Sequence, residues 1–185
     1  MAVTEDTVVK AFREGGGVIR CHARPRLREY TVGQHAFNVA GLISIFNPGA
    51  SSRLLRAALW HDVPERWLGD IPTPLKQMQP DLGGLIKSAE EEIFELLGVD
   101  FNLTKEEKIW LKAADMLELF IYAREEIALG NKSAISLARD TIKIIDDLIK
   151  NNKFPSRFAD YVDSIRESNH MFLPDSVDYL RTEKY

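Results

Sequence analysis

The stretch LLRAALWHDVPERWLGDIPTPLK, residues 54–76, carries the strongest structural signal in the chain. Its first part places apolar residues at helical spacing, which predicts a helix that runs into His61 and Asp62. Pro64 should break or restart this helix, because proline disfavours helical geometry in the residue before it. Residues 71–74 contain two prolines, so they are expected to form an extended elbow rather than a helix.

Helical spacing also dominates on both sides of this stretch, and two capping boxes mark helix starts, at Thr31 with Gln34 and at Thr104 with Glu107. No alternating strand pattern, hairpin signal or internal repeat is present. The glycine run 15–17 is expected to be a flexible joint. The sequence predicts an all-α fold in one domain, residues 1–185, with seven or eight helices. Besides the helix that ends at His61, helices are expected at about 6–14, 31–47, 81–97, 104–129, 133–150, 156–167 and 175–181.

The composition and net charge of the chain exclude several classes of protein. Of 185 residues, 45% are hydrophobic and 28% are charged, a balance that excludes a disordered chain. The net charge of -4 argues against a nucleic-acid partner, so an anionic substrate would need a local basic pocket. Cys21 is the single cysteine, which rules out an internal disulfide. The first residues do not resemble a secretory signal, and no apolar stretch is long enough to cross a bilayer. We therefore expect a cytoplasmic protein with no membrane partner.

Two histidines and two aspartates are the candidate metal ligands: His35, His61, Asp62 and Asp115. His35 and Asp115 both lie amid apolar residues, where an unpaired polar group would be costly. The four side chains can satisfy one another by converging on one divalent cation. The alternative for the His-Asp pair alone is an ordinary polar helix end.

Two further carboxylates follow the His-Asp pair. Glu65 lies four residues after His61, so it projects to the same side if the turn stays helical. A carboxylate beside the metal site can act as general base and then as general acid. Asp70 is expected to support the site. The alternatives are a surface ion pair for Glu65 and a simple turn residue for Asp70.

Basic residues gather near these segments. Four arginines fall within residues 20–28, Lys76 follows the proline elbow, and Lys112 lies three residues before Asp115. Most of these are expected to be solvated, but one or two that point into a metal pocket would bind phosphate.

Taken in order, His35, His61-Asp62 and Asp115 on a helical background resemble the HD-domain metal-dependent phosphohydrolases. Residues 61–76, and residues 112–115 leading to 125–131, resemble the 5′-deoxynucleotidase branch. The run 20–35 is similar to the small phage HD enzymes that destroy dATP in viruses with 2-aminoadenine DNA. The resemblance covers about residues 18–131.

This resemblance implies a residue set and a helical HD-domain bundle. The metal ligands would be the four named above, with Glu65 as the catalytic carboxylate and Asp70 in support. Arg20, Lys76 and Lys112 would contact phosphate, and Cys21, Ala23 and Pro74 would line the sugar and base pocket. The deoxynucleotidase branch commonly carries tryptophan at the position of Cys21. The cofactor would be one divalent transition metal (Zn, Co or Mn), with additional Mg accompanying the phosphates.

Several functions fit these expectations. The first is hydrolysis of dATP to deoxyadenosine and triphosphate. The nearest alternative is a broader 5′-deoxynucleotidase acting on monophosphates. An alternative of another class is a non-catalytic helical module that binds nucleotide or a protein partner. Metal content separates the two classes, because such a module should purify without a stoichiometric transition metal. The resemblance also implies a homo-oligomer, a dimer or a hexamer.

Overall fold

The computed structural model describes residues 3–72, 75 and 78–166. The predicted helix at 175–181, and the candidate site residues Pro74 and Lys76, lie outside this part of the chain. The described residues contain no strand beyond an isolated pairing of Ile19 with Thr31. The all-α prediction is confirmed. The helices are α1 (Glu5–Gly16), α2 (Val32–Phe46), α3 (Ser52–Trp60), α4 (Glu65–Leu68), α6 (Pro80–Leu96), α7 (Lys105–Ala128), α8 (Ala134–Lys150) and α9 (Ser156–Arg166).

Side-chain caps define the starts of the helices that matter for the site. Both predicted capping boxes are present, with Thr31 and Gln34 at the start of α2, and Thr104 and Glu107 at the start of α7. The Ser51 side chain accepts from the backbone N–H of Leu54 at the start of α3. These caps satisfy backbone N–H groups that have no partner within the helix, and so fix where each helix begins.

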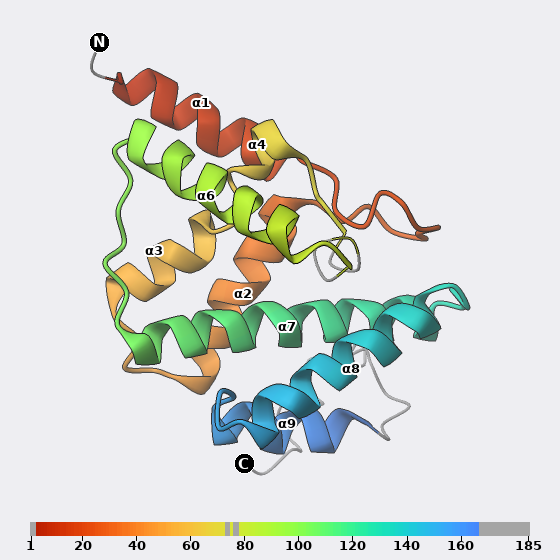
Figure 1. Cartoon of the computed structure of the whole chain (residues 1–185). Helices are drawn as coiled ribbons and strands as arrows, with labels where there is room; N and C mark the ends of the chain where they lie inside the picture. The colour runs from red at the N-terminus through yellow and green to blue at the C-terminus, as the bar shows by residue number, and fades with distance from the viewer. Residues whose placement is uncertain (1–2, 73–74, 76–77, 167–185) are drawn as a thin grey trace, which may run out of the picture.

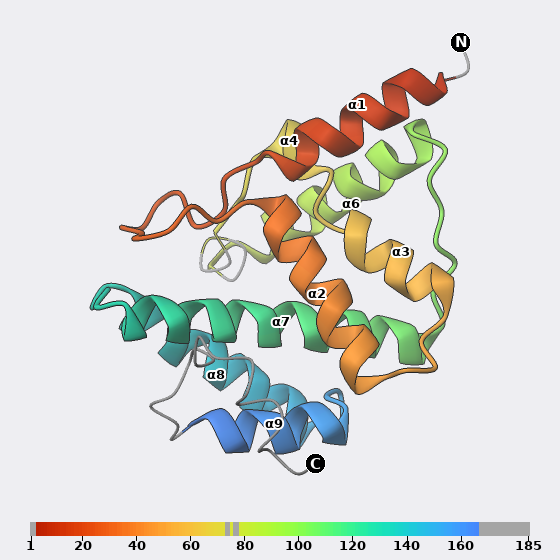
Figure 2. The same cartoon turned by 180° about the vertical axis from the view of Figure 1, so that it is seen from behind.

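Helix α7 lies in the middle of the molecule (Figure 1). It packs against α2 and α3 and against α8 and α9. The view from behind shows α2 crossing α7 (Figure 2). Buried apolar residues from all five of these helices form the main core, including Ile43, Leu54, Leu117, Ile145 and Phe158. Residues of α7 can therefore meet both the His-Asp segment and α8.

The glycine run was predicted to be a flexible joint, and this prediction is wrong. Gly15 and Gly16 form the last turn of α1, and Gly15 is buried. A Cβ atom at Gly15 would lie 2.9 Å from the carbonyl oxygen of Val63. Glycine is thus needed here because α1 approaches the turn after His61 too closely for a side chain.

The connection between α1 and α2 is a long loop, residues 17–31, closed at its base. Arg20 N donates to Tyr30 O at 2.9 Å, and Val32 N donates to Val18 O at 2.9 Å. The loop projects from the helices beyond this closure (Figure 1). Arg20 therefore has a fixed backbone position. Separately, among the described residues no helix is both long enough and apolar enough to cross a membrane.

Candidate metal centre

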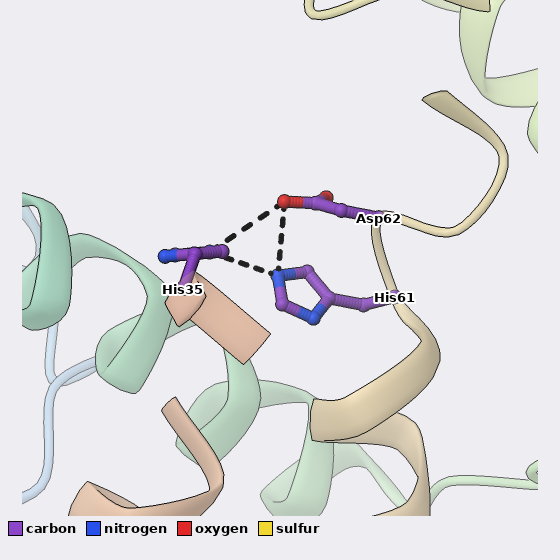
Figure 3. A group of neighbouring side chains, drawn as sticks. All are labelled: His35, His61 and Asp62. Atoms are coloured by element: carbon purple, nitrogen blue, oxygen red, sulfur yellow. Dashed lines mark hydrogen bonds and ion pairs between the residues drawn. The ribbon is translucent and has the colours of Figure 1, made fainter. Parts of the chain in front are cut away.

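Four candidate ligands come from three elements. His35 lies on α2, His61 and Asp62 follow the last turn of α3, and Asp115 lies on α7. Figure 3 shows His35, His61 and Asp62 pointing toward one another. His35 is fully buried, whereas the side chains of His61, Asp62 and Asp115 are 14%, 20% and 15% exposed.

The distances are compatible with a shared cation. One ligand atom from each of His35, His61 and Asp62 lies within 4.8 Å of the others. His35 Nε2 is 3.2 Å from His61 Nε2, 3.5 Å from Asp62 Oδ2 and 3.3 Å from Asp115 Oδ1. Asp115 thus lies beside the other three side chains, with its contact to them made at His35 Nε2. Two imidazole nitrogens and two carboxylates suit Zn, Co or Mn.

The hydrogen-bond network supports a metal at this point. His35 Nδ1 lies 2.5 Å from the Glu118 carboxylate, and His61 Nδ1 lies 2.8 Å from the carbonyl oxygen of Ala58. Both partners accept, so both Nδ1 atoms carry protons and each Nε2 presents a lone pair. With both rings neutral, the two Nε2 lone pairs face each other at 3.2 Å and repel unless a proton or a metal ion lies between them.

The charged groups around the cluster favour a positive charge at this point, either a proton on His35 or a bound cation. Burial and Arg20 lower the pKa of His35, but hydrogen bonds with Asp115 and Glu118 raise it to about 9. Burial lowers the pKa of His61, despite the opposing effect of Asp62. Burial would raise the pKa of Asp115, but Lys112 and His35 hold it well below its usual range. The surroundings therefore favour a cation between ionised carboxylates.

Glu65 and Arg20 lie beside the cluster. The Arg20 guanidinium donates to Asp62 Oδ2 and lies 3.6 Å from Glu65 Oε1. Glu65 is the first residue of α4, its side chain is 14% exposed, and its Oε2 atom is buried without a hydrogen-bond partner. Burial and the nearby Asp62 raise the pKa of Glu65 to about 8, although Arg20 opposes them. This carboxyl can therefore exchange a proton near neutral pH.

Asp70 supports the loop that carries Arg20. Its Oδ2 atom accepts from Cys21 N at 2.6 Å and lies 3.7 Å from His22 Nδ1. Cys21 has a φ of 52°, in the left-handed region that residues other than glycine rarely adopt. The hydrogen bond to Asp70 holds this conformation next to Arg20.

A cavity of about 500 Å³ adjoins these residues. One part of its lining comes from Arg20, Cys21, His22, Ala23, Arg24, Asp70 and Pro72. Lys112 is not among the lining residues; its side chain is 55% exposed and pairs with Asp115 at 2.9 Å. The remaining wall comes from the 116–119 part of α7 and from α8, through Met116, Leu119, Leu137, Asp140, Thr141, Lys143, Ile144 and Asp147.

Two features of this site were not predicted from the sequence. One is the α8 wall, meaning the side of the cavity that residues of α8 form; the types of these residues do not indicate that they line a cavity. The other is Glu118, which contacts His35 from behind the cluster. A signal for Glu118 exists, because it is a lone carboxylate in the apolar run 116–121, three residues after Asp115 and so on the same helix face.

Solved structures share this arrangement of helices. The cyanophage S-2L HD phosphohydrolase DatZ, solved with dA and one catalytic Zn²⁺ ion, superposes with a TM-score of 0.68 at 18% identity, covering 89% of this chain and 95% of its own. An HD-domain phosphohydrolase from Listeria innocua gives 0.67 at 19% identity, covering 87% and 86%. The fold is therefore that of the HD-domain phosphohydrolases.

Sequence comparison narrows this class. The chain belongs to the 5′-deoxynucleotidase YfbR-like family, whose pattern matches residues 16–162. A 5′-deoxynucleotidase of Yersinia pestis (strain Pestoides F) is 28% identical over 100 residues, and so is one of Yersinia pseudotuberculosis (strain IP 31758). Each match covers 46% of this chain, which spans about half (51%) of the length of those relatives.

Proposed function

We propose that this chain is a metal-dependent hydrolase of deoxynucleotides. The observation that carries the proposal is the convergence of His35, His61, Asp62 and Asp115 beside Glu65. Arg20 connects this cluster with the cavity of about 500 Å³, because it pairs with Asp62 and Glu65 and also lines the cavity. The four would hold one divalent transition ion. Such an ion supplies a Lewis acid for a phosphoryl oxygen and an activated water.

The cavity wall favours one orientation of the substrate. The α8 part contains two carboxylates, Asp140 and Asp147, against one lysine, Lys143, and it also contains apolar side chains. Carboxylates repel phosphate, so the sugar and base belong on this side. The phosphates then lie toward Arg20, whose guanidinium is a bidentate phosphate donor. Lys112, which pairs with Asp115 at the cluster, would hold the outer phosphates, and a phosphate contact by Lys76 remains a prediction.

In this orientation the α-phosphorus is the phosphorus nearest the reactive groups. Glu65 takes a proton from the attacking water, whose oxygen bonds to the α-phosphorus. The bond between that phosphorus and O5′ breaks, and the proton passes to O5′. Asp70 keeps the Arg20 loop in place during this step. The products are a deoxynucleoside and the intact phosphate or polyphosphate.

Within this class we favour dATP as the substrate, with deoxyadenosine and triphosphate as products and Mg accompanying the phosphates. The fold likeness to DatZ over 95% of that chain motivates this choice. The second candidate is hydrolysis of deoxynucleoside monophosphates, which the family match and the Yersinia relatives favour. In both reactions a water attacks the phosphorus that is bonded to O5′. A homo-oligomer, dimeric or hexameric, and a cytoplasmic location remain predictions.

A nucleotide panel in ¹⁸O-water tests the proposal. The protein is supplied with Co²⁺ or Mn²⁺ and incubated with dATP, dAMP, ATP and AMP, and the products are separated by chromatography. Deoxyadenosine with labelled tripolyphosphate supports the dATP reaction, and deoxyadenosine with labelled orthophosphate from dAMP supports the second candidate. Stepwise dADP and dAMP would mean attack at the terminal phosphorus and would reverse the orientation. No hydrolysis of either deoxynucleotide by metal-loaded protein would refute the proposed function.

A further inference from the structure

A buried carboxylate lies behind His35, on the side away from the other candidate ligands. Glu118 is on α7, one turn after Asp115, and is only 4% exposed. It contacts His35 at Nδ1, whereas His61, Asp62 and Asp115 lie near the other ring nitrogen, Nε2. A buried carboxylate is costly unless several donors satisfy it, so its surroundings call for an explanation.

Three donors from two elements meet this carboxylate. His35 Nδ1 lies 2.5 Å from Oε2, and the Tyr30 hydroxyl donates to the same oxygen. Asn38 Nδ2 donates to Oε1 at 3.1 Å. The side chain therefore has both oxygens engaged, and its plane is fixed relative to the His35 ring.

Tyr30 is itself held firmly. Its ring stacks on that of Tyr122, with centroids 3.7 Å apart and planes inclined by 7°. Its carbonyl oxygen accepts from Arg20 N at 2.9 Å. The hydroxyl that donates to Glu118 thus belongs to the same closed loop that presents Arg20.

We infer that Glu118 is a positioning residue, which fixes His35 in the tautomer with the proton on Nδ1 and the Nε2 lone pair aimed at the metal. The inference rests on the proposed function, since it assumes that the ligand cluster holds a metal. A carboxylate that accepts from the far nitrogen of a ligating histidine orients the ring and raises its basicity as a ligand. Removing such a partner weakens metal binding by ~10–100-fold.

The test measures metal affinity without reference to activity. Zn²⁺ dissociation constants are obtained by chelator competition for the wild type, Glu118→Gln and Glu118→Ala. We expect ~10-fold weaker binding for Glu118→Gln, which keeps an acceptor oxygen, and ~100-fold for Glu118→Ala.

Glu126→Gln is the matched control. Glu126 is also a buried glutamate on α7, at 1% exposed, but its partners are loop groups and Asn131 rather than a histidine. Its loss should destabilise the fold while the Zn²⁺ affinity stays at the wild-type value. Equal weakening in Glu126→Gln and Glu118→Gln would show a general effect of destabilisation and would overturn the inference.

A second measurement needs no variant. Long-range ¹H–¹⁵N correlation spectra of the Zn²⁺-loaded wild type report which imidazole nitrogen carries the proton. We expect a protonated Nδ1 and a bare Nε2 for His35. The opposite tautomer, or a wild-type Zn²⁺ affinity in Glu118→Gln, would overturn the role of Glu118 alone. A wild type that binds no Zn²⁺ or Co²⁺ would overturn the proposed function as well.

Discussion

Replacing Glu126 by alanine should loosen the far part of the 17–31 loop, around Leu27 and Arg28. The Glu126 carboxylate accepts from Leu27 N at 2.8 Å, from Arg28 N at 3.2 Å and from Asn131 Nδ2 at 2.7 Å. These bonds join the far part of the 17–31 loop to the end of α7. Burial opposes ionisation of Glu126, but the donors, with Leu27 N first among them, hold its pKa below the usual value.

The expected size follows from these bonds. Hydrogen bonds to charged groups contribute ~1.5–3 kcal/mol each, and the partly exposed loop lets water replace some of this after truncation. We therefore expect Glu126→Ala to lower the free energy of unfolding by ~2–4 kcal/mol. For a chain of this length that corresponds to a fall in Tm of roughly 4–16 °C.

Urea denaturation measures this change, and Glu125→Ala is the control. Glu125 is the preceding residue on α7; its side chain is 27% exposed and forms an ion pair with Arg28 Nη1 at 2.9 Å. A partly exposed pair contributes ~1 kcal/mol or less, so Glu125→Ala should be nearly neutral. If the two variants lose the same stability, the loop is not held by Glu126 and the reasoning is wrong.

Three further outcomes follow from the same contacts. Glu65→Gln should retain the metal and the wild-type Tm but lose ~10²–10⁴-fold in turnover; loss of metal would make it a ligand instead. Gly15→Ala should destabilise the fold by ~1–3 kcal/mol, because its Cβ would lie 2.9 Å from a backbone oxygen, whereas Gly41→Ala, with nothing within 4 Å, should be neutral or stabilising in thermal unfolding. Hydrogen bonds, the one from Ser51 first, lower the pKa of Glu107 to about 2, so the folded state binds fewer protons than the unfolded state near pH 4. The stability advantage of wild type over Glu107→Gln should be complete above about pH 4.5 and disappear as the pH falls to about 2; an unchanged difference at low pH would contradict this.

The helices could be predicted because their signals are local. The capping residues Thr31 and Thr104, and the proline at 64, act within one or two turns of the chain. The glycine run misled the prediction, since a flexible joint and a close helix approach both require glycine. Only the distance from Gly15 to Val63, 48 residues along the chain, separates the two.

The candidate site could be predicted in part for a related reason. His35, His61, Asp62 and Asp115 stand out as polar residues in apolar helices, and the structure brings them together. The spacing from Asp115 marks Glu118 as a residue of the same helix face, but its contact with His35 depends on how α7 packs against α2. The α8 wall depends on how α7 packs against α8, and spacing within one segment carries no information on either packing.

The central claim is that these four side chains hold one catalytic metal ion. Metal analysis of the purified wild type, His61→Ala and Asp115→Ala, each dialysed against Co²⁺ and then freed of loose ions, tests it most directly. We predict about one ion per chain in the wild type, and loss of both the ion and deoxynucleotide hydrolysis in each variant. Full hydrolysis by metal-depleted His61→Ala protein would contradict the claim.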